Sequence, residues 1–239
     1  MIRSYRNFGH MMVEAMLSMK GIERYYEMSS ETVKALDGIN IEIGEGERVL
    51  LLGPSGSGKT TLLNCIAALD NPTAGEYSFN GNEVPRGHAE KMTSFRRDNI
   101  GYVFQFYNLL QDLTALENIL LIQELSGGRD GGRARELLRL VGLEGEVDRF
   151  PAEMSGGQQQ RVAIARSLAK APKLLLGDEL TGNLDSKTTA MVMEVLVKAC
   201  ESENITTVMV THDESLSKYA TRVVRLDSGI VTSDEKMGL

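Results

Sequence analysis

The chain has 239 residues, of which 42% are hydrophobic and 25% charged, which suits one large globular domain or a domain with an inserted lobe. Its net charge of −7 argues against an extended surface for nucleic acid or anionic membrane, so any anion site must be local. The two cysteines, Cys65 and Cys200, lie far apart in apolar helical segments, which excludes a disulfide framework or a Cys-based zinc site and favours a reducing compartment.

Residues 1–18 are expected to be a loose extension of unknown role. They match a signal peptide poorly because Glu14 interrupts the apolar part, and their methionines leave a later start open. The sequence has no run near the roughly 18 consecutive apolar residues that a membrane-spanning helix needs. The chain is therefore not expected to cross a bilayer by itself.

Three strands are expected next. Lys20–Tyr26 forms the first, and Ile39–Ile43 and Arg48–Leu52 flank a Gly-Glu-Gly-Glu turn. Tyr25 and Tyr26 are adjacent in a strand and so face opposite sides, which lets one ring pack while the other is presented.

A glycine-rich loop, GPSGSGKTT, follows the third strand and precedes the helical run Leu62–Leu69. Its residues are Gly53, Pro54, Ser55, Gly56, Ser57, Gly58, Lys59, Thr60 and Thr61. Such a loop lets successive amide N–H groups and the helix N-terminus point at phosphate oxygens. Lys59 is expected to reach the β- and γ-phosphates, and the Thr60 hydroxyl to hold Mg²⁺. The loop predicts a nucleoside triphosphate site.

The chain then changes from strands to helices. Tyr77–Phe79 followed by Asn80-Gly81 is typical of a hairpin, and the short strand Ile100–Phe104 ends at Gln105. Locally, Gln105 fits a solvated strand end as well as a ligand-binding position. Helices are expected at 89–98, Thr114–Ile122 and Arg133–Val141.

A second helix terminus suited to anions is expected in MSGGQQQRVAIARSLAKAP, from Met154 to Pro172. The first turn of this amphipathic helix consists of Ser155, Gly156, Gly157 and Gln158. An ordinary Ser-capped helix has the same local pattern. The similar sequence LSGGR at residues 125–129 is rejected because the following Asp130-Gly131-Gly132 is not expected to open a stable helix.

Two carboxylates come after the expected buried strand Lys173–Gly177. Asp178 and Glu179 would lie at the edge of a parallel sheet where ligands bind, although a solvated strand end is the alternative. Asp178 can hold Mg²⁺ through water, and Glu179 can polarise an attacking water. A further strand, Ile205–Val210, leads into Thr211-His212-Asp213.

Taken together, these residues resemble the nucleotide-binding subunit of an ATP-binding cassette (ABC) transporter over about residues 19–235. The motifs, in order, are the Walker A loop 53–61, the Q-loop at Gln105, the signature MSGGQ at 154–158, the Walker B end LLLGDE at 174–179, the D-loop Asn183-Leu184-Asp185 and the switch His212. Within the family, FRRDNIGYVFQFYNLL, LTALENI and TGNLDSKT are most similar to the lipoprotein-releasing, macrolide-exporter and cell-division group.

The resemblance implies an α/β fold: a P-loop (RecA-like) core with an antiparallel β subdomain and an inserted helical subdomain. The core and β subdomain would comprise residues 19–105 and 170–235. The helical signature subdomain would comprise residues 106–169, and residues 236–239 a tail.

The resemblance also assigns roles to the matching residues. Glu179 would be the catalytic base and His212 would bridge it to the γ-phosphate, with Lys59 and Gln105 completing the catalytic set. The Mg²⁺ contacts would be Thr60, Gln105 and Asp178. Tyr26, ten residues before Leu36, is similar to the aromatic residue that stacks on adenine, with Tyr25 as the second candidate.

Residues 155–158 match the element that closes on ATP held by the opposite subunit, and Asp185 is assigned to the nucleotide contacts. Two copies, paired head to tail about a twofold axis, would sandwich two ATP molecules. The implied partners are separate transmembrane permease subunits, with no nucleic acid and with membrane contact only through the permease. The implied location is the cytoplasmic face of the cell membrane, and the implied work is export, lipoprotein extraction or mechanotransmission.

Three residues depart from the family pattern. Leu180 replaces the proline that usually follows Glu179, Gly177 replaces a usual alanine, and Met154 replaces a usual leucine. Because proline would fix the turn into the D-loop, Leu180 is expected to loosen this turn and slow hydrolysis.

Two other functions fit the sequence less well. A soluble ABC-type ATPase that acts as a clamp in translation or DNA repair predicts tandem cassettes or a long coiled-coil insertion, and this sequence contains neither. A GTPase or P-loop kinase requires an Asn-Lys-x-Asp motif or a lid of arginines, and the first is absent. Neither alternative accounts for MSGGQQQRVAIAR.

Overall fold

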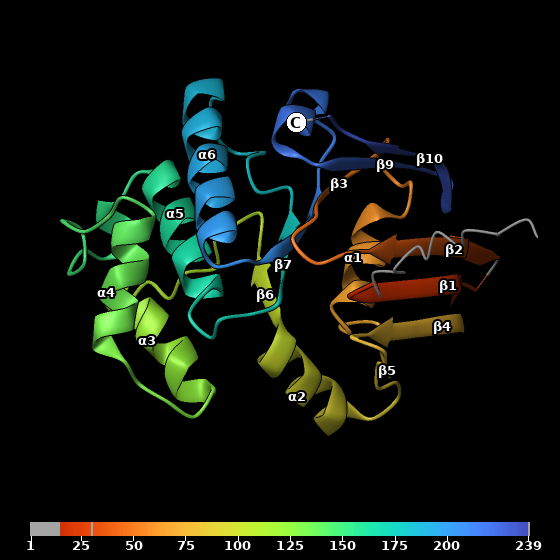
Figure 1. Cartoon of the computed structure of the whole chain (residues 1–239), viewed down its shortest axis with the longest axis horizontal. Coiled ribbons are helices and arrows are strands. Elements are labelled where there is room, and N and C mark those ends of the chain that lie inside the picture. The colour runs from red at the N-terminus through yellow and green to blue at the C-terminus, as the bar shows by residue number, and fades with distance from the viewer. Residues whose placement is uncertain (1–14, 30, 239) are drawn as a thin grey trace, which may run out of the picture.

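The computed structural model describes residues 15–29 and 31–238 as two sheets flanked by helices (Figure 1). The expectation for residues 1–14 lies outside the described residues. Packing extends slightly beyond the expected domain of residues 19–235, because Met16 and Leu17 are already buried in the core and strand pairing continues to Lys236. In the part of the chain that the structure describes, no helix is long and apolar enough to span a membrane.

The larger sheet has six strands in the order β10-β9-β3-β8-β7-β6. Its strands are β3 (Arg48–Leu52), β6 (Ile100–Val103), β7 (Leu174–Asp178), β8 (Thr206–Val210), β9 (Arg222–Asp227) and β10 (Ile230–Lys236). All pairs are parallel except β9 with β10. The central strands are buried nearly throughout, as expected where both faces of a parallel sheet are covered.

The two faces of this sheet bury different side chains. Along β3, Leu50 and Leu52 belong to one buried cluster, whereas Val49 and Leu51 belong to another. This alternation follows from the twofold side-chain period of a strand. The first cluster lies toward the helical part of the chain, and the second toward the antiparallel sheet.

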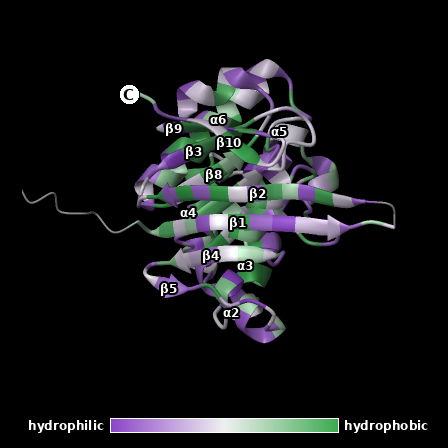
Figure 2. Ribbon diagram, turned by 90° about the vertical axis from the view of Figure 1, so that its right-hand side faces the viewer, coloured by the Kyte–Doolittle hydropathy of each residue, from purple (hydrophilic) through white to green (hydrophobic). Residues whose placement is uncertain are grey.

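The smaller, antiparallel sheet has the strand order β2-β1-β4-β5 (Figure 2). Its strands are β1 (Leu17–Glu27), β2 (Thr32–Ile43), β4 (Ala74–Phe79) and β5 (Asn82–Glu83). The expected hairpin is confirmed by the pairing of Phe79 with Asn82. Hydrophobic and hydrophilic residues alternate along β2, where Ile39, Ile41 and Ile43 are buried, so one face of the sheet contributes to the core.

Six α-helices connect and cover these strands in the described part of the chain. They are α1 (Lys59–Ile66), α2 (Ala89–Asn99), α3 (Ala115–Leu125), α4 (Gly131–Leu140), α5 (Gly156–Ser167) and α6 (Ser186–Ser202). Figure 1 shows α3, α4 and α5 grouped on one side of the six-stranded sheet. The helix expected over residues 154–172 is shorter, and the helix expected over 62–69 begins and ends three residues earlier.

The expectation that Asp130-Gly131-Gly132 cannot open a helix was wrong, because α4 begins at Gly131. The Asp130 carboxylate accepts a hydrogen bond of 2.9 Å from the Arg133 N–H and so caps the helix. Ala134 and Leu137 on the same helix are fully buried. The cap and this burial together outweigh the low helix propensity of two glycines.

A buried asparagine, Asn118 of α3, anchors the segment that follows β6. Its carbonyl oxygen accepts from the Leu110 N–H at 2.9 Å. Its amide donates to the backbone carbonyls of Leu110, Leu113 and Thr114. This segment begins just after Gln105, so Asn118 connects that position to the helical part.

Replacing Asn118 by leucine is expected to lower the free energy of unfolding by about 1–3 kcal/mol, because backbone groups would be left without partners. The measurement is the urea midpoint followed by circular dichroism. Ile119→Val, which removes one buried methylene from the same helix, is the reference, with an expected loss of about 0.5–1.5 kcal/mol. A loss for N118L no larger than that of I119V would contradict the anchoring role.

Candidate active site

A cleft of about 780 Å³ opens at the C-terminal edge of the parallel sheet. Its lining residues are Val33, Lys34, Ala35, Ser55, Gly56, Ser57, Gly58, Lys59, Thr60, Thr61, Glu179, His212 and Ser228. The strand order brings them together, because β3, β8 and β7 are neighbours and the loops that follow them lie side by side. Most of the expected loop therefore shares one cleft with Glu179, His212 and Ser228, which lie far along the chain.

The glycine-rich loop turns sharply into α1 at Gly58. Its φ is +98°, in the left-handed region, and a Cβ there would lie 2.4 Å from the Ala35 carbonyl oxygen. Only glycine fits this position. The turn places the N-terminal residues of α1 on the cleft, where their free amide N–H groups favour an anion.

The donors of this loop suit a phosphate. The buried Lys59 ammonium donates to the carbonyls of Gly53, at 2.9 Å, and Pro54, at 2.8 Å. The buried Ser57 hydroxyl lacks a hydrogen-bond partner among the described residues. A bound phosphate would supply acceptor oxygens to both groups, so the residues present fit the expected ligand.

A pair of oxygen ligands lies beside the loop. The Thr60 hydroxyl donates to the Asp178 carboxylate at 3.3 Å. Burial, together with the nearby charge of Glu179, raises the pKa of Asp178, although the Thr60 hydrogen bond opposes this. No cluster of three or more His, Cys, Asp or Glu side chains suited to a metal occurs within residues 15–29 and 31–238. Mg²⁺ held here by Thr60 and Asp178 would have phosphate oxygens and waters as its further ligands.

The Glu179 carboxylate is held at the cleft by two neighbours from the end of β8. One oxygen contacts the His212 Nδ1 at 3.0 Å, and the other accepts from the Thr211 hydroxyl at 3.3 Å. The Glu179 side chain is 20% exposed and that of His212 73%. The hydrogen bond to Glu179, and then its charge, raise the pKa of His212.

Leu180, which was expected to loosen the turn after Glu179, is instead packed in the core and 5% exposed. It belongs to the buried cluster on the helical side of the sheet. The structure therefore does not support a loose turn at this position.

Other expected site residues do not line the cleft. Gln105 is half-buried, and its backbone carbonyl accepts from the Asn183 amide at 3.4 Å. The Tyr26 hydroxyl donates to Asp70 at 2.7 Å, and the Arg24 guanidinium lies 4.3 Å from its ring centre. Tyr25 has its own acidic partner, Asp37, and also lies outside the lining.

The second helix terminus, at Ser155, is well formed but separate from the cleft. The Ser155 hydroxyl accepts from the Gln158 N–H at 3.3 Å, and the Gln158 side chain accepts from the Ser155 N–H at 2.9 Å. This capping box begins α5 as the sequence predicts. Asp185 likewise caps α6, and its hydrogen bonds to Thr188 lower its pKa.

The segment after Gln105 is tied to α5. The Arg166 guanidinium, in the last turn of α5, donates to the backbone carbonyls of Tyr107, at 2.8 Å, and Asn108. The Tyr107 hydroxyl comes within 2.9 Å of where a Cβ on Gly156 would lie. Movement of this segment would therefore reach both ends of α5.

Sequence reasoning missed several residues of the cleft. Lys34 and Ala35 come from β2, and Ser228 comes from the β9–β10 turn. No local motif marks these residues, because their place depends on packing between the sheets. Thr211 had a usable signal, since it directly precedes His212 at a strand end.

This geometry defines an α/β protein with a glycine-rich loop suited to phosphate and a carboxylate in the same cleft. The family model for "ABC transporter" matches residues 36–182. The chain belongs to the ABC transporter family, as an ATP-binding subunit with ATPase activity.

Close relatives span nearly the whole chain. The lipoprotein-releasing system ATP-binding protein LolD of Geobacter metallireducens is 45% identical over 225 residues, covering 93% of this chain and 100% of the relative. A macrolide export ATP-binding/permease protein, MacB of Bdellovibrio bacteriovorus, is 41% identical over 93% of this chain, which spans 34% of that protein.

Solved structures confirm the expected fold class. The dimeric post-hydrolysis structure of the cassette MJ0796 of Methanocaldococcus jannaschii, bound to ADP and Pi, has a TM-score of 0.83 and 42% identity. It covers 94% of this chain and 100% of that chain. Hydrolysis of ATP by this class of protein is therefore consistent with the carboxylate at the cleft.

The pKa of His212 is expected to exceed the ordinary value of about 6.5, because the Glu179 carboxylate stabilises the charged imidazole. The measurement is an NMR titration of the His212 ring in the nucleotide-free protein. The ion pair is fully present below the ordinary pKa and is lost as the pH rises through the raised one. In Glu179→Gln, the midpoint is expected to fall toward the ordinary value, and an unchanged midpoint would contradict this pairing.

Proposed function

We propose that two copies of this chain pair head to tail, and that each ATP lies between the loop 53–61 of one copy and residues 155–158 of the other. The observation that supports this most directly is that the cleft contains the loop, Glu179 and His212 but not the capped terminus of α5. One copy thus presents two anion-binding helix ends at different places. A twofold pairing brings each end to the nucleotide of its mate.

Within each cleft, the loop amides and Lys59 bind and orient the phosphates. Thr60 and Asp178 would hold Mg²⁺, with Gln105 as a further contact, and the ion would neutralise phosphate charge. Glu179 orients a water and accepts its proton, while His212 and Thr211 hold the carboxylate in place. Ordered donors of this kind need no rearrangement when charge develops.

The remaining assignments belong to the same proposal. Tyr26 stacks on adenine, which requires its ring to leave the contact with Arg24 or to use the opposite face. Asp185, at the start of α6, contributes to the nucleotide contacts from the D-loop. The helical subdomain comprises residues 106–169, and the core and β subdomain comprise residues 19–105 and 170–235, to which the ends of the paired strands add residues 17–18 and 236.

The dimer is tested with Glu179→Gln, which removes the base but keeps the shape of the side chain. Hydrolysis is expected to fall by about 100-fold or more. Saturating ATP should then shift the variant from monomer to dimer on size-exclusion chromatography. A persistent monomer with bound ATP would contradict the proposal.

Two substitutions of Ser155, each combined with E179Q, provide a further test and its matched control. Asp and Asn cap a helix about as well as Ser, so both variants keep α5 intact. Ser155→Asp places a carboxylate against phosphate and should prevent dimerisation while ATP binding to the monomer remains. Ser155→Asn should still dimerise.

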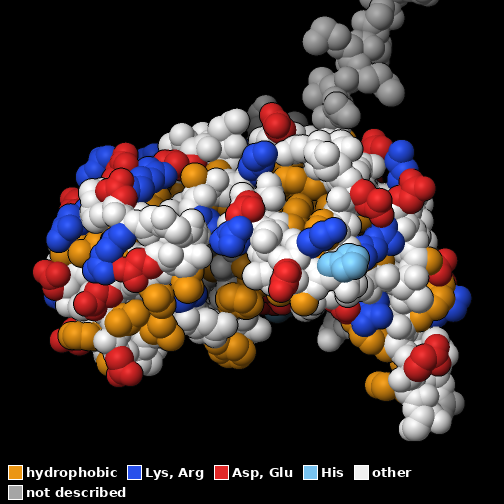
Figure 3. Space-filling model, turned by 90° about the horizontal axis from the view of Figure 1, so that it is seen from below, with side chains coloured by type: hydrophobic (Ala, Val, Ile, Leu, Met, Phe, Trp, Pro, Cys, Tyr) orange, Lys and Arg blue, Asp and Glu red, His pale blue; other side chains and the backbone are white. Residues whose placement is uncertain are grey.

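We further propose that the permease docks on an apolar groove next to Gln105. The groove has a volume of about 360 Å³ and is lined by Ala67, Leu69, Arg96, Ile100, Gly101, Tyr102, Phe104, Asn108, Ile122, Arg166, Ser167 and Lys170. Leu69 is 50% exposed and Phe104 38%, which is unusual for large apolar side chains at a concave surface. Figure 3, seen from the side of α2 and α3, shows hydrophobic side chains gathered among charged ones.

The basic side chains around the groove indicate which kind of permease segment would bind there. Arg96, Arg166 and Lys170 line it, so an amphipathic permease segment with apolar residues and a carboxylate would fit. Burial lowers the pKa of Lys170 to about 8, and a bound carboxylate would raise it again by stabilising the charged ammonium. Docking here would place the chain at the cytoplasmic face of the membrane and serve export, lipoprotein extraction or mechanotransmission.

The double variant Leu69→Ser/Phe104→Ser is expected to lose binding to membrane vesicles that contain the permease. ATP hydrolysis by the isolated chain should change less than twofold, because neither residue lines the ATP cleft. Binding is measured by vesicle flotation against vesicles without permease. Ile230→Ser, at a 47% exposed position on β10, is the control and should bind normally.

A further inference from the structure

Glu179, whose carboxylate lies at the cleft, has an unusual backbone conformation. Glu179 has φ +47°, a left-handed conformation that few residues other than glycine adopt. Its N–H donates to the Val210 carbonyl at 3.0 Å, and its own carbonyl accepts from the Gly182 N–H at 3.1 Å. Such a conformation persists only where the surroundings impose it.

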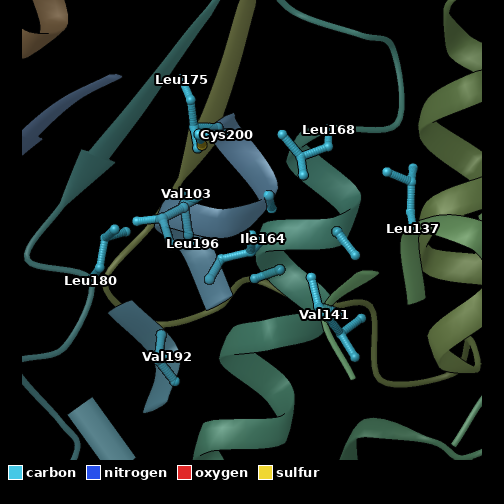
Figure 4. Packing of buried hydrophobic residues seen from close by; sticks show 14 of the residues in the cluster. Val103, Leu137, Val141, Ile164, Leu168, Leu175, Leu180, Val192, Leu196 and Cys200 are labelled. Carbon is cyan, nitrogen blue, oxygen red and sulfur yellow. The ribbon is translucent and has the colours of Figure 1, made fainter. Parts of the chain in front are cut away.

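Leu180 provides that constraint through its contact with Gly177. A Cβ built on Gly177 would lie 2.8 Å from both the Cγ and the Cδ1 of Leu180, so the leucine occupies the space that an alanine methyl would need. The leucine is buried in the cluster that includes Val103, and Figure 4 shows its side chain directed toward Val103. Leu180 and Gly177 are therefore a matched pair.

A proline at position 180 could not serve in the same way. Its Cδ would press against the backbone N–H and Cβ of Glu179 and favour an extended conformation there. The left-handed conformation of Glu179 therefore goes together with leucine at position 180 and glycine at position 177.

We propose that Leu180 is a positioning residue: seated in the space above Gly177, it holds Glu179 in its left-handed conformation and directs the carboxylate between Thr211 and His212. The inference rests on the proposed role of Glu179 as the base. Leu180 is buried and does not line the cleft, so it would act only through its neighbour in the chain.

The test compares Leu180→Ala with Leu196→Ala. Leu196 is 1% exposed in the same cluster but lies on α6, away from Glu179. Truncating Leu180 is expected to lower kcat about tenfold with KM for ATP within twofold, because a small misplacement of a reacting group costs rate. L196A is expected to lower Tm but keep kcat within twofold.

A double-mutant cycle separates positioning from general loss of packing. Gly177→Ala alone should lower kcat, because its methyl group displaces Leu180. In G177A/L180A the methyl group has room, so kcat should be no lower than in L180A. Additive losses, or equal kcat values for L180A and L196A, would overturn the proposal.

Two further measurements keep the outcome unambiguous. If L180A does not fold, Leu180→Val is used instead. Because it removes only one methylene, kcat is expected to fall by a smaller factor, about twofold to threefold. An unchanged kcat in L180V would overturn the proposal. E179Q is assayed in parallel. Normal hydrolysis by E179Q would refute the base assignment itself, whereas an inactive E179Q with a fully active L180A would refute only the positioning role.

Discussion

The parallel pairing of β3, β8 and β7 is the constraint on which the site depends. Val210, at the end of β8, is in register with Leu51 of β3 and with Asp178 of β7. The three strands therefore end at one level, where their C-terminal segments meet: the glycine-rich loop, Thr211 with His212, and Glu179. None of these segments is near another in sequence. Ligands bind at this edge of open α/β sheets because the strand order leaves a crevice between diverging loops.

The same sheet also divides the interior. Side chains of its central strands alternate between two buried clusters. One cluster includes residues of α3, α4, α5 and α6, and the other includes residues of α1 and the antiparallel sheet. The cleft thus lies beside both sheets. The Ala35 carbonyl of β2 packs closely against Gly58, in the loop that follows β3. Leu180 belongs to the cluster on the helical side and directly follows Glu179 in the chain. The packing of this core cluster therefore extends to the residue next to the cleft carboxylate.

Charge in this protein is organised locally rather than globally. The net charge is −7, yet a lysine and a helix N-terminus create an anion site within one cleft. The helix terminus at Ser155 has a side-chain cap, which the α1 terminus at Gly58 lacks, but it does not belong to the cleft that contains the glycine-rich loop and Glu179. Arg166 and Tyr107 connect that helix to the segment after Gln105, beside the apolar groove. In the proposed head-to-tail pairing, a permease that moves this segment would also act on the helix end at Ser155.

The sequence by itself determined the glycine-rich loop with its strand and helix, the capping box of α5, the hairpin after Phe79 and the strands that deliver Glu179 and His212. These features follow from local chemistry: backbone freedom at glycine, side-chain capping and hydrophobic period. Only the tertiary structure decided that Lys34, Ala35 and Ser228 line the cleft, that Tyr26 contacts Asp70, and that Leu180 is packed rather than loose. Each of these depends on which distant groups come into contact, and contacts between distant segments are set by sheet order and packing rather than by neighbours in the chain.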